Sequence, residues 1–286
     1  MEALRFGVAM LDLSSPSGRD SLRLVPERGA LVSHWQVAGR DLLYFDAERF
    51  RDPAQSVRGG IPLLFPICGN LPGDRYEWED RRYSLKQHGF ARDRAWTVVE
   101  QAPAQVTLAL DSDADTRAGF PFDFTLTYTV ALGEGVLNLR FGLENRDDRP
   151  LPFSLGIHPY FAVSDKFALR LRIPAERWQD QKNGQWESFE GAFDWDRPEI
   201  DAAFRDLRRP EVTLVDAAAG HCLTLRFDPA FGTFVAWTLA GKDYLCLEPW
   251  TAPRNAIGSG DGLLRLAPGE SRELAIALSV ETLEAR

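Results

Sequence analysis

The sequence predicts an all-β protein, built as a large antiparallel β-sandwich. Apolar and polar residues alternate along many short segments, which is the pattern of strands with one buried face. Glycine and proline turn signals separate these segments, and stretches with helical periodicity are rare. No low-complexity linker and no repeat of fixed period divides the chain. We therefore expect residues 1–286 to form a single domain.

The first clear strands lie between residues 106 and 145. Residues 106–110 read VTLAL, and residues 124–130 read FTLTYTV, with Phe124, Leu126 and Tyr128 on one face. Residues 136–145 repeat this alternation. The GEG sequence between these last two segments predicts a short hairpin loop.

The second half of the chain continues the pattern. Further strands are expected at residues 167–173, 221–228, 234–239 and 272–283, and residues 245–247 form an apolar strand that ends at Glu248. The stretch from Ala202 to Arg209 is the one candidate for a helical turn, because Pro198 and Pro210 bound it.

The composition indicates a globular protein of a reducing compartment. Of 286 residues, 44% are hydrophobic and 26% are charged, and the net charge of −9 disfavours nucleic acids and anionic membranes as partners. Three scattered cysteines without a CxxC pair argue against a disulfide framework. The N-terminal sequence does not read as a secretory signal, and no apolar stretch is long enough to span a membrane. We expect a cytoplasmic protein.

Four polar segments interrupt the strands and hold the candidate functional residues. The first, VRGGIPLLFPICGN, places Arg58 before two glycines. The second, LKQHGFARDRAW, holds His88 and Arg92, which we expect to face a cleft while Phe90 and Trp96 pack inward. The glycine after the histidine can adopt backbone angles denied to other residues, which favours a tight turn.

The third and fourth segments supply acid/base groups at strand ends. His158 lies in FSLGIHPYF, and Glu248 lies in YLCLEPWTAPRNA. Burial would raise the pKa of the Glu248 carboxyl, as a general base requires. Each residue alone also fits a structural role, such as a hydrogen-bonded histidine or an exposed carboxylate. Together with the flat faces of Tyr160 and Trp250, the set suits proton transfer on a bound polyhydroxy ligand.

Several of these segments resemble the aldose 1-epimerase (galactose mutarotase-like) family, in its bacterial branch near the glucose-6-phosphate 1-epimerases. They are RGGIPLLFP, LKQHGFARD, GIHPYF and LEPWTAPRNA followed by GLLRLAPGES, which occur in the family's order and cover most of the chain. The resemblance implies a galactose mutarotase-like supersandwich. It implies His158 as general acid, Glu248 as general base and His88 as the second active-site histidine. It also implies that Asp201 binds substrate hydroxyls, and that Arg58 and Arg92 lie on the substrate side.

The implied activity is interconversion of the α and β anomers of a hexose by acid/base ring opening and closure. Neither a metal nor a nicotinamide is expected, and the only expected partner is a small sugar or sugar phosphate. The alternatives are a hexose-6-phosphate 1-epimerase, for which Arg58, Arg92 and Arg254 could bind the phosphate, and a non-catalytic carbohydrate-binding protein. The sequence EPWTAPRNA favours the free aldose.

Two further functional interpretations, a glycosidase and a zinc site, explain the sequence less well. A glycosidase could use Glu248 and Asp201 as its carboxylate pair, but the two histidines would then have no role. A zinc site lacks the usual ligand spacing among the four histidines, which are His34, His88, His158 and His221. We assign His34 and His221 to structure or solvent.

Overall fold

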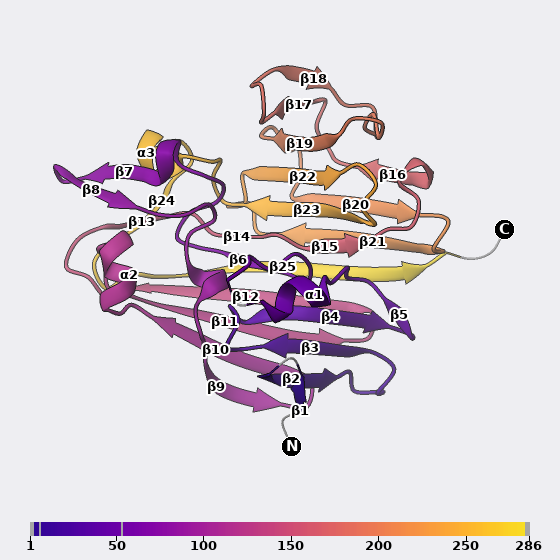
Figure 1. Cartoon of the computed structure of the whole chain (residues 1–286), viewed down its shortest axis with the longest axis horizontal. Coiled ribbons are helices and arrows are strands. Elements are labelled where there is room, and N and C mark those ends of the chain that lie inside the picture. Colours follow the sequence, from indigo (N-terminus) through magenta and orange to yellow (C-terminus); the bar gives the residue numbers. More distant parts are fainter. Residues whose placement is uncertain (1–2, 6, 53, 284–286) are drawn as a thin grey trace.

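The computed structural model describes residues 3–5, 7–52 and 54–283, and it confirms a mostly β protein built from antiparallel sheets (Figure 1). One eight-stranded sheet has the order β16-β20-β21-β25-β12-β11-β10-β9. In chain order, its strands are β9 (Thr97–Ala102), β10 (Gln105–Asp111), β11 (Phe124–Gly133), β12 (Val136–Asn145), β16 (Leu169–Arg172), β20 (Glu211–Asp216), β21 (His221–Phe227) and β25 (Ser271–Thr282).

A second eight-stranded sheet carries most of the polar segments. Its order is β18-β17-β19-β22-β23-β14-β6, and β15 also pairs with β23. Its strands are β6 (Leu63–Leu64), β14 (Gly156–Ile157), β15 (Tyr160–Ala162), β17 (Arg177–Asp180), β18 (Trp186–Ser188), β19 (Glu199–Phe204), β22 (Thr233–Leu239) and β23 (Tyr244–Trp250).

Smaller elements complete the described chain. A five-stranded sheet joins β1 (Ala3–Arg5), β2 (Val8–Ser14), β3 (Ser21–Val25), β4 (Leu31–Val37) and β5 (Arg40–Asp41). Two-stranded sheets pair β7 (Arg75–Trp78) with β8 (Arg81–Ser84), and β13 (Leu151–Phe153) with β24 (Leu264–Leu266). The helices are short: α1 (Ala47–Arg51), α2 (Ala114–Gly119), α3 (Ala256–Ser259), and the 3₁₀ turns η1 (Pro72–Asp74), η2 (Ala91–Asp93) and η3 (Lys166–Ala168).

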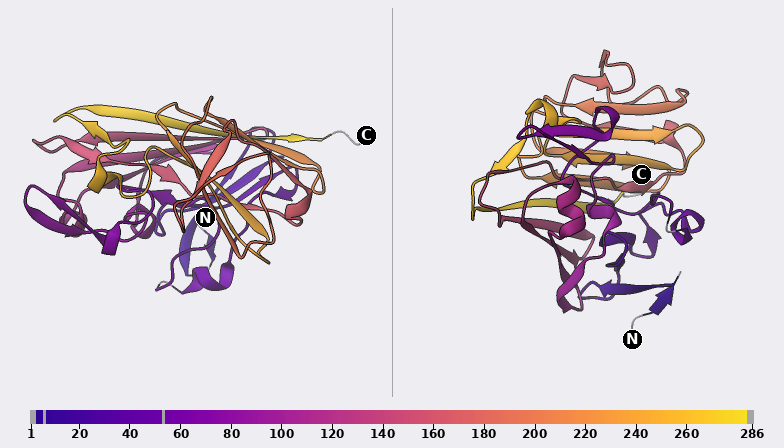
Figure 2. Two further views of the ribbon diagram at one scale, coloured as in Figure 1. Left: turned by 90° about the horizontal axis from the view of Figure 1, so that it is seen from above. Right: turned by 60° about the vertical axis from the view of Figure 1, so that its left-hand side comes forward.

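The sheets form a sandwich around a shared apolar core. Figure 2 shows the arrangement of the strands in two further views. One cluster of buried side chains draws members from both eight-stranded sheets and from the five-stranded sheet. Isolated β-bridges join β4 to the segment before β6, at Val32 and Ile61, and the segment after β5 to β15, at Leu43 and Phe161. None of the helices in the described ranges is long and apolar enough to cross a membrane.

The alternation that predicted the strands is confirmed residue by residue. In β11 every second side chain from Phe124 is buried, and in β12 every second side chain from Leu137 is buried. The two strands pair in register up to Gly133 and Val136, so the expected short hairpin loop is also confirmed. The expected strand at residues 167–173 begins two residues later, because η3 precedes β16.

The expected helical turn at residues 202–209 is wrong. Residues up to Phe204 belong to β19, which pairs along its length with β22 and also with β17. Ala202 and Ala203 are buried in this sheet, so pairing on both sides overrides the helix preference of alanine.

Candidate active site

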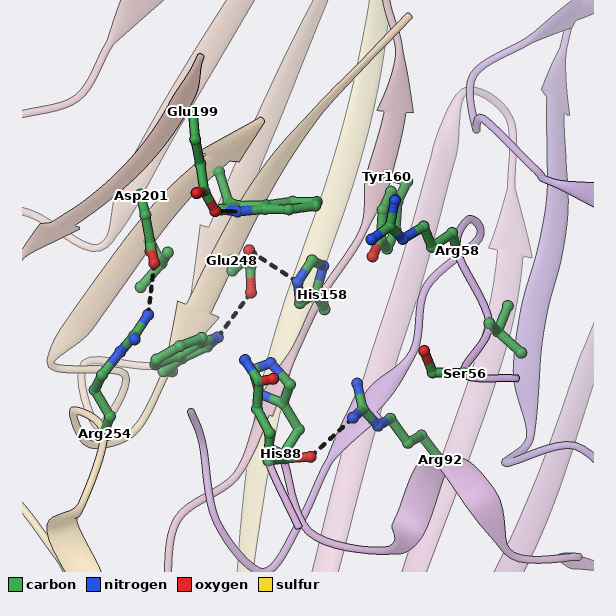
Figure 3. A pocket seen from close by; sticks show the side chains of 15 residues that line it. Ser56, Arg58, His88, Arg92, His158, Tyr160, Glu199, Asp201, Glu248 and Arg254 are labelled. Carbon is green, nitrogen blue, oxygen red and sulfur yellow. Dashed lines mark hydrogen bonds and ion pairs between the residues drawn. The ribbon is translucent and has the colours of Figure 1, made fainter. Parts of the chain in front are cut away.

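A cavity of about 270 Å³ lies on the face of the second sheet that is turned away from the shared core (Figure 3). Strand alternation explains how the sequence builds it. In β23, Leu245 and Leu247 point into the core, whereas Glu248 and Trp250 line the cavity. Strands β19 and β22 contribute in the same way. Their cavity-lining residues are Glu199, Asp201, Val235 and Trp237.

His158 and Glu248 meet in this cavity and form its central pair. His158 lies between β14 and β15, and its Nε2 atom is 3.3 Å from Glu248 Oε1. The second carboxylate oxygen, Oε2, accepts a hydrogen bond of 3.2 Å from the indole nitrogen of Trp250. Glu248 is 1% exposed and His158 is 9% exposed, so the carboxyl reaches solvent only through the cavity.

Burial shifts the pKa values of this pair in opposite directions. Burial, together with the nearby Asp201 carboxylate, raises the pKa of Glu248 well above its usual value. Burial, together with the positive charge of Arg92, lowers the pKa of His158 to about 3. Both charged forms are therefore disfavoured, and the pair is most stable when it shares one proton and carries no net charge.

His88 is held by two hydrogen bonds to a single glycine. Its backbone N–H donates to the carbonyl of Gly69 at 2.7 Å, and the Gly69 N–H donates to Nδ1 of its ring at 3.1 Å. Burial, with the charge of Arg92, lowers the pKa of His88 well below its usual value, so the ring is neutral. Because Nδ1 accepts, Nε2 carries the ring proton. His88 thus lines the cavity as a hydrogen-bond donor.

Asp201 and Arg254 form an ion pair at one end of the cavity (Figure 3). The Nη2 atom of Arg254 lies 2.8 Å from Asp201 Oδ2, and Gln181 donates to Oδ1 at 2.9 Å. Burial raises the pKa of Asp201, against the opposing charge of Arg254. Asp201 thus lines the cavity, where the resemblance implied a ligand for substrate hydroxyls. Arg254 pairs its charge with Asp201 and lies apart from Arg58 and Arg92.

Arg58 and Arg92 line the other end, beside Ser56. Arg92 donates from Nη2 to the carbonyl of Gln87 at 2.8 Å, and its buried Nε atom has no partner among the described residues. None of the ion pairs in residues 3–5, 7–52 and 54–283 involves Arg58 or Arg92. This end of the cavity therefore presents positive charge that no carboxylate of the described chain pairs with.

The structure brings all seven sequence-predicted site residues to one cavity. They are Arg58, His88, Arg92, His158, Asp201, Glu248 and Trp250. Sequence reasoning missed Glu199 and Trp237, which are joined by a hydrogen bond of 2.9 Å. A signal for Glu199 was present, because it lies two positions before Asp201 and so shares its face of β19.

The remaining predictions about histidine and packing have mixed outcomes. His34 contacts Ser33 through Nδ1 at 2.9 Å and does not line the cavity, and His221 is buried on β21. Trp96 is buried as expected, whereas Phe90 is only partly buried and packs against the edge of the core.

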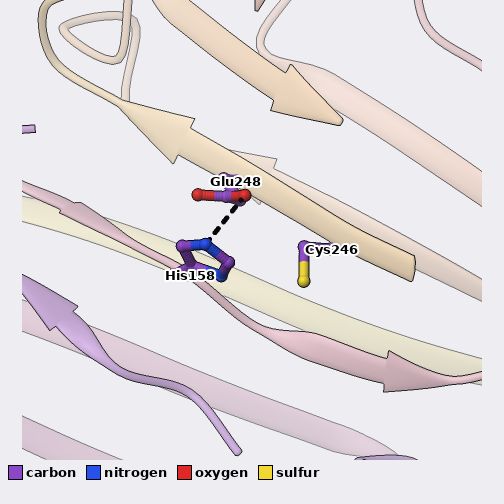
Figure 4. A group of neighbouring side chains, drawn as sticks. All are labelled: His158, Cys246 and Glu248. Carbon is purple, nitrogen blue, oxygen red and sulfur yellow. Dashed lines mark ion pairs between the residues drawn. The ribbon is translucent and has the colours of Figure 1, made fainter. Parts of the chain in front are cut away.

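One group of side chains in the described chain has the composition and spacing of metal ligands (Figure 4). It consists of His158, Cys246 and Glu248, whose ligand atoms all lie within 4.8 Å of one another. Cys246 precedes Glu248 by two positions on β23, so both project to the same side of the strand. Histidine spacing alone could not reveal this group, because two of its members are not histidines.

Comparison with known proteins agrees with this architecture. Residues 18–279 match the family described as aldose 1-epimerase. The Slr1438 protein of Synechocystis sp. PCC 6803 has a crystal structure that superposes with a TM-score of 0.94 at 42% identity, covering 99% of this chain and 100% of that one. A galactose mutarotase-like protein of Clostridium acetobutylicum superposes with a TM-score of 0.82 at 19% identity, covering 99% of this chain and 98% of the other.

Two sequence relatives add detail. A Cenchrus ciliaris protein named "Putative glucose-6-phosphate 1-epimerase" is 31% identical over 156 residues, which cover 50% of this chain and only 44% of that protein. The chromosomal LacX protein of Lactococcus lactis is 25% identical over 231 residues, covering 71% of this chain and 77% of LacX. The match over residues 18–279 shows that the chain belongs to the aldose 1-epimerase family.

Proposed function

We propose that this protein is a mutarotase that interconverts the α and β anomers of a hexose. The observation that carries the proposal is the buried contact of 3.3 Å between His158 and Glu248 in a polar cavity. Such a pair can give up one proton and accept another in the same step, which is what anomer exchange needs.

Ring opening removes a proton from the C1 hydroxyl and adds one to the ring oxygen. Burial favours the form in which the shared proton lies on Glu248, and the reacting form is the one in which that proton has moved to His158 Nε2. Glu248, then a carboxylate, takes the hydroxyl proton, and His158, then an imidazolium, gives its Nε2 proton to the ring oxygen. Rotation about the C1–C2 bond then presents the other face of the aldehyde. Closure reverses both transfers, so the pair ends with the protons it had at the start. Each positioned transfer is worth about 10²–10⁴-fold in rate.

Neighbouring groups hold the sugar and the carboxylate in place. The Trp250 indole N–H fixes one oxygen of Glu248, so the other oxygen faces the reacting atoms. His88 donates its Nε2 proton to the oxygen on which negative charge develops. Asp201, held by Arg254, accepts hydrogen bonds from hydroxyls at the far end of the sugar.

A second candidate substrate is a hexose 6-phosphate. The observation that favours it is the pair of arginines at the other end, because neither Arg58 nor Arg92 has a carboxylate partner in the described chain and Arg92 keeps a free Nε donor. Guanidinium groups bind phosphate oxygens in a bidentate fashion. The Cenchrus ciliaris protein that matches half of this chain is named "Putative glucose-6-phosphate 1-epimerase".

The experiment is polarimetry of freshly dissolved α-glucose, α-galactose and glucose 6-phosphate with the native protein and with Glu248→Gln. We expect catalysis by the native protein and a loss of about 10²–10⁴-fold in the variant, because the amide cannot accept the hydroxyl proton. Equal rates in a folded variant would remove Glu248 from the mechanism. Sugar binding without catalysis by the native protein would make this a carbohydrate-binding protein.

A further inference from the structure

We propose that His158, Cys246 and Glu248 form an inhibitory zinc site at the inner side of the cavity, which His158 and Glu248 line and behind which Cys246 is buried. The three side chains offer an imidazole nitrogen, a thiolate sulfur and a carboxylate oxygen, all within 4.8 Å of one another. These three ligand types are the ones that Zn²⁺ uses in proteins, whereas Mg²⁺ and Ca²⁺ prefer oxygen alone. Figure 4 shows His158 facing Glu248, with the Cys246 side chain beside them on the strand that also carries Glu248.

The distance between the nitrogen of His158 and the oxygen of Glu248 matches the distance between two ligands of a tetrahedral zinc ion. Nitrogen and oxygen ligands of tetrahedral Zn²⁺ lie about 3.3 Å apart, as follows from bond lengths of about 2.0–2.1 Å. The observed separation of His158 Nε2 and Glu248 Oε1 is 3.3 Å. A sulfur ligand lies about 3.6 Å from its neighbours in the same geometry. Because no two ligand atoms of the group are more than 4.8 Å apart, the Cys246 sulfur lies at most about 1.2 Å beyond its tetrahedral distance from either partner.

Charge and access also suit the ion. A thiolate and a carboxylate together neutralise the two charges of Zn²⁺, which matters because Cys246 and Glu248 are almost fully buried. The thiol proton and the proton shared by the pair leave to solvent on binding. His158 and Glu248 line the cavity, so the fourth position of the ion opens toward it. A water or a sugar hydroxyl can occupy that position.

Zinc in this place would stop the proposed reaction, since it occupies the lone pair of His158 and the carboxylate of Glu248. The binding claim does not depend on the proposed function, but the inhibition claim does. Direct metal binding is therefore measured first, by calorimetric titration of the metal-free protein with ZnCl₂. The variants are Cys246→Ala and, as the matched control, Cys222→Ala, which removes a partly exposed thiol on β21.

We expect one zinc ion per chain, and at least about 10-fold weaker binding in Cys246→Ala, because even partners outside the first ligand shell are worth about 10–100-fold. Cys222→Ala should bind as the native protein does. Titration of the native protein with CoCl₂ should give the near-ultraviolet absorption of a thiolate–cobalt bond. This readout tests thiolate ligation even if Cys246→Ala does not fold. No saturable zinc binding, no thiolate–cobalt absorption, or equal weakening in both variants would overturn the site.

Inhibition is measured next on the native protein, with a hexose and increasing ZnCl₂, followed by a chelator. We expect inhibition that competes with the sugar and is reversed by the chelator. Zinc that binds through Cys246 but leaves the rate unchanged overturns the inhibitory role. Zinc binding by a protein that catalyses no anomer exchange overturns the proposed function and leaves the metal site standing.

Discussion

At the scale of single residues, the site depends on side chains whose hydrogen bonds fix one orientation. Gly69 accepts from the backbone of His88 and donates to its ring, so the ring can present only Nε2–H to the cavity. Trp250 does the same for Glu248 by occupying one carboxylate oxygen. Fixed donors of this kind lower a barrier because they need not reorganise during the reaction.

Replacing His158 by asparagine should lower kcat far more than it changes KM. The imidazole donates its proton only as the ring oxygen becomes basic, so its contribution appears chiefly in the transition state. Steady-state kinetics on the best hexose measures both constants. A variant with unchanged kcat and a raised KM would mark His158 as a sugar ligand rather than the acid.

Replacing Arg92 by alanine should raise KM for glucose 6-phosphate more than for glucose, because only the phosphate ester brings negative charge to the arginine end of the cavity. Arg94→Ala is the matched control, since Arg94 pairs with Asp113 and Asp115 at the surface. Such surface pairs contribute about 0–1 kcal/mol to stability and nothing to the cavity. If Arg92→Ala leaves the kinetics of every sugar unchanged, the arginine is structural.

At the scale of elements, strand β23 separates structure from chemistry by its two faces. Leu245 and Leu247 belong to the shared core, whereas Cys246, Glu248 and Trp250 lie on the opposite face. A shift of pairing by one residue would exchange the two faces. The long register of β23 with β22 is therefore as necessary to the site as the side chains themselves.

The turn after His88 offers a sharp test at this scale. Gly89 has φ of +70°, and a Cβ atom there would lie 2.2 Å from the carbonyl oxygen of Phe65. Gly89→Ala should therefore cost more than the roughly 1–2 kcal/mol of the left-handed conformation alone, and it should also displace His88 and lower kcat. Chemical denaturation and kinetics give the two readouts.

Gly18→Ala is the control for this variant. Gly18 has a similar φ of +73°, but a Cβ atom there meets nothing within 4 Å. The control should thus report the backbone cost alone and leave activity unchanged. Equal losses of stability in both variants would show that the contact with Phe65 is relieved by a small shift.

At the scale of the whole molecule, the sequence predicted the strands whose apolar and polar residues alternate. It missed elements whose conformation depends on pairing with strands that are distant in the chain. Alternation located β11, β12 and β21, because one buried face leaves a period of two. Alternation did not locate β19, because its alanines favour a helix in the sequence. In the structure β17 and β22 pair with β19 on its two sides and make it a strand.

The candidate site shows the same division. Motifs singled out Glu248 and His158 because each polar residue follows an apolar stretch. The expected end of the strand at Glu248 is wrong, because β23 continues to Trp250. Trp237 and Cys246 carried no such mark, since an aromatic or a thiol within an apolar strand reads as core. Only the fold shows that their face of the sheet is the one turned toward the cavity.

Stability should fall as the pH is lowered, in part through His221. The side chain is 6% exposed, and burial lowers its pKa from 6.5 although Asp216 opposes the shift. Below pH 6.5 the unfolded chain gains a proton that the folded chain resists, so this stability is present above 6.5 and is lost as the pH falls toward the folded pKa.

His221→Asn should therefore lose less unfolding free energy than the native protein between about pH 7 and about pH 5. Urea denaturation at both pH values measures the difference. An equal or larger loss in the variant would show that His221 takes up its proton as readily in the folded protein as in the unfolded chain.

The position of β25 has a consequence for how the protein is made. This strand is the last element of the described chain, yet it lies between β12 and β21 in the middle of the long sheet. A ribosome releases β12 and β21 long before Ser271–Thr282, so both present unpaired edges during synthesis. Nascent chains that stop before Ser271 should aggregate or bind chaperones, and proteolysis of stalled ribosome complexes should show protection only once β25 has emerged.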